Sequence, residues 1–503
     1  MKSKPILAAV LAVCAAVFVA CGGDATTEVS QGMVVQHVTV VNTRDGSSAR
    51  DMAVVIDQGR ITAVVPARSV RAGAGVQVVE GAGRYVVPGY LDMHTHALPA
   101  ADATPPPWPL FIANGITGVR EMAGSAALIA RARQLNADRA AGSVDAPEVL
   151  QVPAEPLAGV TPANAAALVQ QKKALGASFI KVVSGSRDGV LAIAQAARTE
   201  GLDVAGHLSV GASAVETAAA GWHAFEHLGA GFGIALDCST QEAAIRQALL
   251  GGQGAQPPFP ATFTMFPTLY RAADAPFYQQ VIDGFDATRC ASVATAIVAA
   301  GTWQVPTLIR LKTSLQGDSA VFTQNPNLRY VDPTTRALWT QLAQQYTATM
   351  PATAAATFRD YYGVYVQVLQ ALRRQGAKLL AGSDQGGIWV IPGFSLHQEF
   401  AELAAAGFTP LEVLQMTTLN GARFLQREAT MGTVEAGRNA DLVLLDADPL
   451  ADVANLSRIG GVLLRGKYFS KSALDTMKEQ VATAQAAQPL RALHTAIDTS
   501  HVD

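Results

Sequence analysis

Short apolar segments alternate with Ala-rich helical segments through most of this 503-residue chain, and this alternation most constrains its fold. Typical pieces are the strand-like "GASFIKVVSG", the helix-like "DGVLAIAQAARTEG" and the strand-like "LDVAGHLSV". Strands that alternate with helices form parallel βαβ units. About eight such units fit between residues 85 and 429, so the pattern predicts an α/β fold built on a (β/α)8 TIM-type barrel.

The segments on either side of the predicted barrel have a β-like pattern instead. Residues 33–84 contain Val- and Ile-rich runs separated by "DG", "QG" and "AG" turns, and similar runs return in residues 430–470. We expect these two flanks to meet as one small discontinuous β-sandwich domain. The barrel would carry an insertion at about 230–300, and residues 471–503 would form a C-terminal helical tail.

The first residues have the pattern of an export signal. Lys2 and Lys4 precede an apolar run that is shorter than the roughly 20 residues a spanning helix needs. The following "FVACGGD" resembles a bacterial lipobox, which predicts a signal peptide at 1–20, a lipidated Cys21 and a flexible tether at 21–32. We therefore expect an exported lipoprotein, at the periplasmic side or outer membrane, whose membrane contact is the lipid anchor. The alternative is ordinary cleavage to a soluble periplasmic protein.

Charge and cysteine content limit the partners. The net charge of −3 leaves no basic surface for nucleic acid, so we expect no such partner. Cys14 and Cys21 belong to the leader, which leaves Cys238 and Cys290. In an oxidising compartment these two are expected to form a disulfide, and the alternative is two buried free thiols. The sequence leaves a homo-oligomer open.

The segment "YVVPGYLDMHTH" ends a predicted strand with two histidines one residue apart, His94 and His96. Side chains at positions i and i+2 of a strand point the same way, so both imidazoles face the inside of the predicted barrel. A single core histidine is more often structural than a ligand. The paired spacing instead favours a site for a divalent metal.

Four other polar residues close β-like segments later in the chain. Lys181 lies in "FIKVV", where a lysine without a partner inside an apolar strand is costly. His207 ends "LDVAGH", His227 ends "WHAFEH" and Asp384 ends "LLAGSD". Because the ends of barrel strands build the active site, we expect these side chains to meet the two histidines there.

The ordered set of motifs resembles the metal-dependent amidohydrolase superfamily, which includes imidazolonepropionase. It is most similar to the branch of Xaa-Pro and Xaa-Arg dipeptidases. The matching pieces run from about residue 35 to 470 and are "VVPGYLDMHTH", "FIANGITGVREMAG", "GASFIKVV", "VAGH", "GWHAFEHLG", "VPTL", "LLAGSD", "FTPLEVLQMTTLNGARFL" and "GTVEAGRNADLVLLDADPL". This resemblance implies the barrel, the small β domain and a metal-dependent hydrolase.

The resemblance also implies a binuclear metal centre. Zn(II) is the expected metal, with Mn(II), Co(II) and Fe(II) as alternatives, and some relatives bind a single metal. The implied ligands are His94, His96 and Asp384 for the first metal, His207 and His227 for the second, and a carbamylated Lys181 that bridges the two.

The function implied is hydrolysis of an amide or peptide-like C–N bond by metal-activated hydroxide. Asp384 would take a proton from the attacking hydroxide and pass it to the leaving amine. A small dipeptide or N-acyl amino acid is the expected substrate. The alternatives are a cyclic amide, a lactone or another ester, and a binding lipoprotein without catalysis.

Three further residues are candidates for substrate contact or for support of the ligands. Arg120 in "GVREM" either binds an anion or pairs with Glu121 or Asp92. His397 either lines the pocket or supports it from behind. Ser209 stands where relatives in the dipeptidase branch often carry a tyrosine that holds the substrate carboxylate, and this difference puts dipeptide specificity in doubt.

Overall fold

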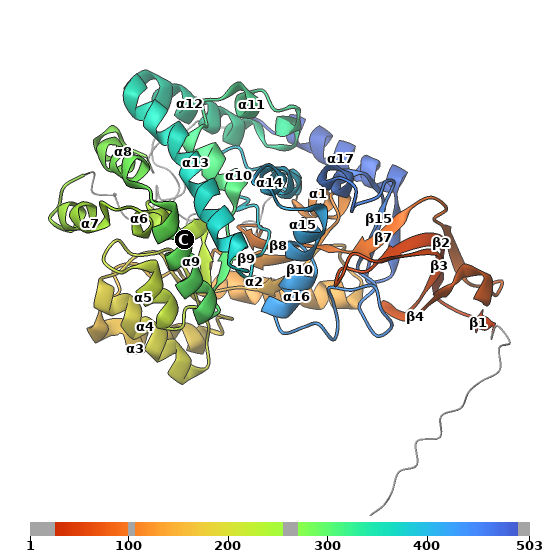
Figure 1. Ribbon diagram of the computed structural model, residues 1–503. Coiled ribbons are helices and arrows are strands. Elements are labelled where there is room, and N and C mark those ends of the chain that lie inside the picture. Colours follow the sequence, from red (N-terminus) through yellow and green to blue (C-terminus); the bar gives the residue numbers. More distant parts are fainter. Residues whose placement is uncertain (1–25, 99–105, 255–269, 491–503) are drawn as a thin grey trace, which may run out of the picture.

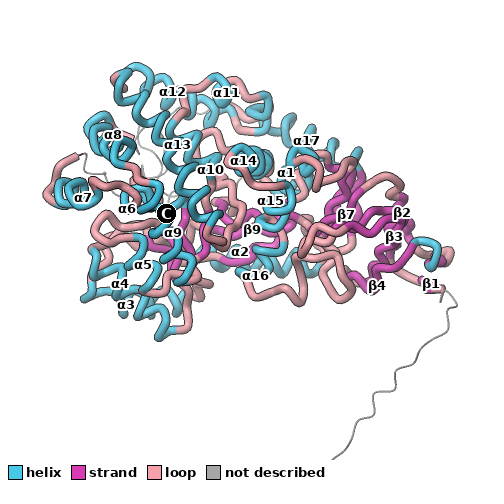
Figure 2. The backbone as a smooth tube through the Cα atoms, viewed as in Figure 1, coloured by secondary structure: helices cyan, strands magenta, loops and turns pink. Residues whose placement is uncertain are grey.

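The computed structural model describes residues 26–98, 106–254 and 270–490. The predicted signal peptide and Cys21 lie outside these residues. Most strands of one sheet gather at one end of the molecule, and the helices surround further strands in the larger body (Figures 1 and 2). Within the described ranges, no helix combines the length and apolar character needed to cross a membrane.

The strand-rich end is a mixed eight-stranded sheet, in the order β17-β16-β15-β7-β2-β3-β4 with β6 beside β2. Its two halves come from opposite ends of the chain, because β15 pairs antiparallel with β7 (Figure 1). We call it the composite sheet. Its strands are β2 (Met33–Val41), β3 (Ser48–Asp57), β4 (Arg60–Pro66), β6 (Gln77–Glu80), β7 (Tyr85–Pro88), β15 (Leu442–Leu445), β16 (Ile459–Leu464) and β17 (Lys467–Ser470).

A second, two-stranded sheet corrects the predicted tether. Residues 27–29 form β1 (Thr27–Val29), which pairs in parallel with β5 (Val70–Ala72). Val29 is buried in a cluster with Val34 and Val55 of the composite sheet. Burial of this valine explains why these residues are ordered. The β1–β5 pair covers only part of one face of the composite sheet. The predicted sandwich therefore consists of one eight-stranded sheet and one two-stranded sheet.

The larger body contains two parallel sheets rather than one continuous barrel sheet. The first has the order β10-β9-β8 and the second β11-β12-β13-β14. Their strands are β8 (Tyr90–Thr95), β9 (Ile116–Glu121), β10 (Glu148–Gln151), β11 (Ile180–Val182), β12 (Val204–Gly206), β13 (Ala224–Glu226) and β14 (Trp303–Val305). The predicted boundary also shifts, because β7 belongs to the composite sheet and the body begins at β8.

Residues 378–381 connect the two parallel sheets by backbone hydrogen bonds. The N–H of Leu380 donates to the carbonyl of Gln304 in β14, and the N–H of Met93 in β8 donates to the carbonyl of Ala381. On the other side, the N–H of Ser178 donates to the carbonyl of Val152, just after β10. The α/β prediction is confirmed, whereas a closed eight-stranded barrel is not formed as one sheet.

Helices follow most strands and surround the strands of the body (Figure 2). Their ends follow sequence signals: Ser186 caps the first turn of α4, and Gly201 ends that helix in a left-handed conformation. The α-helices are α1 (Trp108–Ala113), α2 (Ala126–Ala141), α3 (Pro162–Leu175), α4 (Arg187–Glu200), α5 (Ala214–Ala219), α6 (Gly233–Asp237), α7 (Glu242–Leu250), α8 (Ala275–Gly284), α9 (Ala287–Ala300), α10 (Leu308–Leu315), α11 (Ala320–Thr323), α12 (Pro333–Thr349), α13 (Ala352–Arg374), α14 (Phe394–Ala405), α15 (Pro410–Met416), α16 (Leu419–Phe424) and α17 (Lys471–Ala486). Short 3-10 turns are η1 (Ala67–Ser69), η2 (His227–Gly229), η3 (Ala272–Asp274), η4 (Pro326–Tyr330) and η5 (Val453–Ser457).

The insertion after β13 packs against α13 through aromatic side chains. Tyr278 of α8 makes ring contacts with Phe358 and Tyr361 of α13. The Tyr361 hydroxyl donates to the carbonyl of Phe232, which immediately precedes α6. A disulfide joins Cys238, at the end of α6, to Cys290 in α9. These contacts fix the start of the insertion, a few residues beyond the strand end at β13.

Glu399 of α14 gives a testable pH dependence of stability. Its Oε2 accepts a hydrogen bond from the backbone N–H of Ile309. Burial raises the pKa of Glu399 to about 8. Between its ordinary pKa and about 8, the folded state therefore holds a proton that the unfolded state has lost, and stability falls as pH rises through that window.

We expect Glu399→Gln to remove this cost while keeping a carbonyl acceptor for Ile309. The free energy of unfolding of the variant should exceed that of wild type by an amount that grows to a few kcal/mol at pH 8, because one pKa unit is worth about 1.4 kcal/mol. Urea unfolding from pH 5 to 8.5 measures this difference. The control is Glu402→Gln. Glu402 is on α14 with Glu399, and its substitution breaks an ion pair with Lys312 of α10, so the variant should show no such gain.

Candidate metal centre

His94, His96 and Asp384 converge at the end of β8. One donor atom from each lies within 4.8 Å of the others. Nε2 of His96 is 3.1 Å from Oδ1 of Asp384, and Nε2 of His94 is 3.4 Å from the same oxygen. The two-residue spacing along the strand places both imidazoles on one face, and the residues after 378–381 bring Asp384 beside them.

His227 and His207 lie next to this group. Nε2 of His227 is 3.8 Å from Oδ2 of Asp384. Its ring centroid is 4.4 Å from that of His94 and 5.2 Å from that of His207. Both histidines directly follow their strands, β12 and β13, so parallel pairing brings them to the same edge of the sheet.

Lys181 is the middle residue of β11 and is 5% exposed. Burial lowers the pKa of its amine, although the charges of Asp384 and Glu226 act in the opposite direction. The structure thus places Lys181 inside the charge environment of the histidine group.

The protonation states suit a divalent cation. Burial lowers the pKa of His94 to about 4 and that of His227 to about 3, and it lowers the pKa of His207 well below its usual value. Burial alone would raise the pKa of Asp384, but the nearby histidines hold it well below its ordinary range. The ligand forms of these groups, neutral imidazole and carboxylate, therefore prevail at neutral pH. Nε2 of His94 is buried without a hydrogen bond, as expected for an atom that binds a metal.

Two residues behind the histidines fix their orientation. Nδ1 of His94 lies 2.7 Å from a carboxylate oxygen of Glu226. Nδ1 of His227 lies 2.6 Å from the hydroxyl of Thr307. Each contact occupies Nδ1 and leaves Nε2 directed toward Asp384, which is the arrangement that orients histidine ligands in metalloproteins. Sequence reasoning did not assign a role to either residue, although Glu226 and Thr307 lie in the motifs "WHAFEH" and "VPTL".

Backbone strain concentrates at the same edge. His227, Thr307 and Asp384 have φ of 54°, 43° and 53°, in the left-handed region that non-glycine residues seldom adopt. Such conformations persist only where the surrounding structure enforces them, and they gather at functional sites. This signal cannot be read from the sequence, because all three positions carry ordinary side chains.

Arg120 pairs with neither Glu121 nor Asp92. Its Nη1 donates to Oε1 of Glu226 at 2.8 Å, and its guanidinium lies 4.4 Å from the ring centre of Phe179. Burial would raise the pKa of Glu226, but Arg120 and then His94 outweigh it and lower that pKa strongly. Arg120 therefore holds the carboxylate that orients His94 and is not available to a substrate anion.

A different arginine lies at the centre itself. Nε of Arg310 is 3.1 Å from Oδ2 of Asp384, and its Nη1 donates to the hydroxyl of Ser314. Arg310 is on α10, the helix that begins directly after Thr307, and its side chain is almost completely buried. Sequence reasoning missed it, since a lone arginine in a helix carries no spacing signal.

His397 and Ser209 have structural contacts. Nε2 of His397 lies 3.0 Å from the carbonyl of Asn114, and its ring packs on Tyr90, at the opposite end of β8 from the metal-site histidines. Of the two roles left open for His397, these contacts exclude that of lining the metal site. The Ser209 hydroxyl donates to the carbonyl of Gly185 and accepts from the N–H of Gly211, which fixes the loop after β12.

We expect Glu226→Gln to lower the free energy of unfolding by about 3 kcal/mol, because it leaves the buried Arg120 charge without a carboxylate. It should also weaken divalent-metal binding by about 10- to 100-fold, because Nδ1 of His94 loses its ionised partner. Urea unfolding and metal titration measure the two effects. The Glu226→Gln/Arg120→Met double variant should recover part of the stability but none of the metal affinity. Unchanged metal affinity in Glu226→Gln would contradict the orienting role.

Several solved structures with this fold are named as amidohydrolases, dipeptidases or prolidases. A bottromycin amidohydrolase matches with a TM-score of 0.67 at 20% identity, over 93% of each chain. A Xaa-Pro dipeptidase with bound methionine matches at 0.59 and 16%, over 88% of this chain and 100% of its own. A prolidase complexed with N-methylphosphonate-L-proline matches at 0.57 and 19%, over 88% and 100%. At these identities they confirm the dipeptidase-like resemblance at the level of the fold.

Sequence comparison gives the family. No curated protein sequence matches this chain. The model of the amidohydrolase family matches residues 112–468, which is most of the chain and includes four of the six predicted metal-ligand positions, Lys181, His207, His227 and Asp384. The chain therefore belongs to the amidohydrolase family and is a hydrolase that acts on carbon–nitrogen bonds.

Proposed function

We propose that this protein is a metal-dependent hydrolase of small peptide-like amides, of the dipeptidase or N-acyl amino acid amidase type. The observation that carries the proposal is the group of His94, His96 and Asp384 at the end of β8, in which a buried neutral His94 and a buried ionised Asp384 meet the partly exposed His96. We further propose two Zn(II) ions, with His207 and His227 at the second and a carbamylated Lys181 between them. The donor set supports this, since imidazole and carboxylate suit Zn(II).

When bound, the metal would supply a nucleophilic hydroxide near neutral pH and polarise the scissile carbonyl. The protein supplies the proton transfers. Asp384 accepts the proton of the attacking group and delivers it to the leaving nitrogen. Its contacts with His96 and Arg310 keep its carboxylate ionised and aimed into the site. The side chain of His96 is 21% exposed, which marks the side from which substrate reaches these residues.

Arg310 points to a substrate with a carboxylate near the scissile bond. Its guanidinium already pairs with Asp384 at 3.1 Å, which places it beside the reacting atoms, where a guanidinium can also bind a substrate carboxylate by charged hydrogen bonds. One similar solved structure, a Xaa-Pro dipeptidase, holds methionine in its active site, and another, a prolidase, is complexed with N-methylphosphonate-L-proline. A dipeptide or an N-acyl amino acid would present its carboxylate in this position, although Ser209 does not offer the tyrosine seen in the dipeptidase branch.

The test is a panel of Xaa-Pro dipeptides, other dipeptides and N-acyl amino acids, each beside its C-terminal carboxamide. We expect kcat/KM to be higher for the free acids, and Arg310→Gln to lower kcat/KM for the acids by about 100-fold, which corresponds to a lost charged hydrogen-bond pair. The carboxamides should lose much less. Turnover of lactones or esters with none of amides would favour the alternative substrate class. Equal loss for acids and carboxamides would show that Arg310 acts only through Asp384.

We also propose that the protein is exported and anchored through a lipid on Cys21. The support is the sequence alone, since Lys2, Lys4 and the apolar run before Cys21 form the leader. In cell fractionation, Cys21→Ala should move the protein from the membrane fraction to the soluble fraction. An unchanged distribution would favour anchoring by another route.

A further inference from the structure

A cavity of about 280 Å³ lies between the composite sheet and the larger body, remote from the metal centre. Four arginines and one glutamate line it: Arg60, Arg139, Arg427, Arg465 and Glu148. Glu148 begins β10, so the cavity is at the amino-terminal end of the parallel strands, whereas the metal-site residues follow the carboxyl ends. We call it the seam cavity. Its volume corresponds to several water molecules, at about 30 Å³ each, and suits a small ligand.

Two of the four arginines are neutralised by carboxylates. Arg427 makes a two-pronged contact with Glu148, with distances of 2.7 and 3.2 Å. Nη2 of Arg139 is 3.0 Å from Oδ1 of Asp441. These pairs account for the acidic groups at the inner side of the cavity.

Arg60 and Arg465 carry the surplus charge. Both are exposed, and within the described ranges neither forms an ion pair with a carboxylate. Among the described residues, the guanidinium of Arg60 makes one hydrogen bond, from Nη1 to the carbonyl of Gly437, and Arg60 lines the cavity with its remaining donors. Two positive charges are thus in excess in the lining of this cavity, in a chain whose net charge is −3.

Backbone contacts hold these two arginines near each other. Arg60 begins β4, directly after the β3–β4 turn, and Arg465 lies in the β16–β17 turn. A Cβ added at Gly59 would lie 3.0 Å from the carbonyl oxygen of Arg465. The N–H of Ala440, just before β15, donates to the carbonyl of Gly59 in the β3–β4 turn. This bond joins that turn to the strand next to β16. Arg465 itself has a φ of 51°, where asparagine or glycine is favoured. The turns therefore present both guanidinium groups from a fixed framework.

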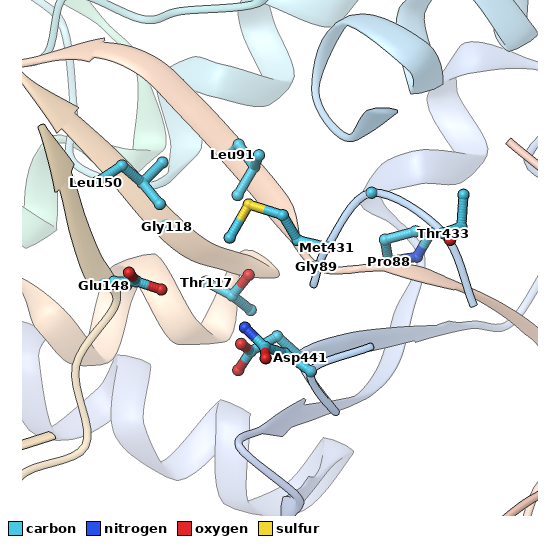
Figure 3. Close-up of a pocket in the computed structure, with 12 residues that line it drawn as sticks. Pro88, Gly89, Leu91, Thr117, Gly118, Glu148, Leu150, Met431, Thr433 and Asp441 are labelled. Atoms are coloured by element: carbon cyan, nitrogen blue, oxygen red, sulfur yellow. The ribbon is translucent and has the colours of Figure 1, made fainter. Parts of the chain in front are cut away.

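A smaller cavity lies next to the seam cavity and is lined by two carboxylates, those of Glu148 and Asp441. It shares Glu148 and Asn439 with the seam cavity. Glu148 and Asp441 lie beside Thr117 at its polar end, and Leu91, Leu150 and Met431 lie at the other (Figure 3). Asp441 thus lines the smaller cavity but not the seam cavity, whose lining holds four arginines and one acid, Glu148.

We propose that the seam cavity binds a small soluble polyanion of the phosphate type, held by Arg60 and Arg465. Guanidinium groups bind such oxyanions through paired charged hydrogen bonds. The ligand would contact the β3–β4 and β16–β17 turns together with α2, and so would link the composite sheet to the body. The site is separate from the metal centre and does not depend on the proposed reaction.

The test is isothermal titration calorimetry with inorganic pyrophosphate, at constant ionic strength, on the metal-loaded chain. We expect wild type to bind one more equivalent per chain than the Arg60→Gln/Arg465→Asn double variant. Each single variant should weaken this binding at least tenfold. Arg465→Asn should fold, because asparagine tolerates a positive φ. Any binding of pyrophosphate to the metals is common to all variants, so the difference isolates the seam cavity.

Arg71→Gln is the matched control, because Arg71 is an exposed arginine of β5 and its loss changes the net charge equally. It should bind as wild type does. Identical isotherms for wild type and the double variant would overturn the proposal. Co-sedimentation with phosphatidylglycerol vesicles separates a lipid source: variant-sensitive binding to vesicles without binding of pyrophosphate would overturn the soluble ligand.

Discussion

Asp384→Asn is expected to lower kcat by at least about 10³-fold while the fold remains intact, because loss of a positioned general base alone costs about 10²–10⁴-fold. The carboxylate of Asp384 lies within 4 Å of nitrogens of His94, His96, His227 and Arg310. An amide in its place can neither accept the proton of the attacking group nor balance these nitrogens. The substitution therefore removes both the proton carrier and a metal ligand.

Steady-state kinetics on the best amide of the panel, with metal content and circular dichroism, checks this result. Asp188→Asn, an exposed substitution on α4, is the control and should keep wild-type kcat. A kcat within tenfold of wild type would show that another group carries the proton. A loss of native circular dichroism would place the effect on folding, and the charge-conserving Asp384→Glu variant would then separate the two, since it keeps the charge but displaces the carboxylate.

Local periodicity explains how much of the site the sequence could predict. His94 and His96 share a face because strand side chains repeat every two residues, and this holds whatever the rest of the fold does. His207, His227 and Asp384 each close an apolar segment, so the barrel interpretation alone placed them at one edge. The structure brings these side chains close together even though the parallel strands form two sheets.

The supporting contacts could not be predicted, because they join residues that are distant in the chain. Glu226 reaches His94 across 132 residues, and Thr307 reaches His227 across 80. No sequence spacing identifies which distant residue a glutamate inside a strand will contact. Arg310 is similar, since it meets Asp384 only after the helices between β14 and residue 378 have returned the chain to the site.

The boundary between the composite sheet and the first strand of the body, β8, is marked in the sequence only by a Pro-Gly pair. "YVVPGYLDMHT" reads as one apolar strand, yet it is divided at Gly89. A side chain there would collide with Thr117 of β9, so only glycine allows the chain to pass from the composite sheet into β8. The Pro-Gly pair marks a change of sheet, which can be recognised only when both sheets are known.

Lys181→Ala is expected to hold less metal than wild type when both proteins are purified with bicarbonate. Wild type should hold two metal ions per chain if a carbamate on this lysine bridges them, and the variant should hold one or none. The position supports the expectation, because β11 carries Lys181 in register with Ala205 of β12, two residues before His207. A buried lysine without an anionic partner is costly, whereas a carbamate becomes an anionic ligand.

Metal content by elemental analysis, with the mass of the intact chain measured under mild conditions for the added carbon dioxide, gives two independent readouts. Lys172→Ala is the matched control: Lys172 is also largely buried but pairs with Glu155 on the surface of the body, so its loss should leave metal content unchanged. One metal per chain in wild type, unchanged in Lys181→Ala, would contradict the binuclear centre. The three residues His94, His96 and Asp384 would then hold the single metal, and Lys181 would act on the substrate or on the fold. A fall from two metals to one with no added mass would separate the lysine's role in metal binding from carbamylation.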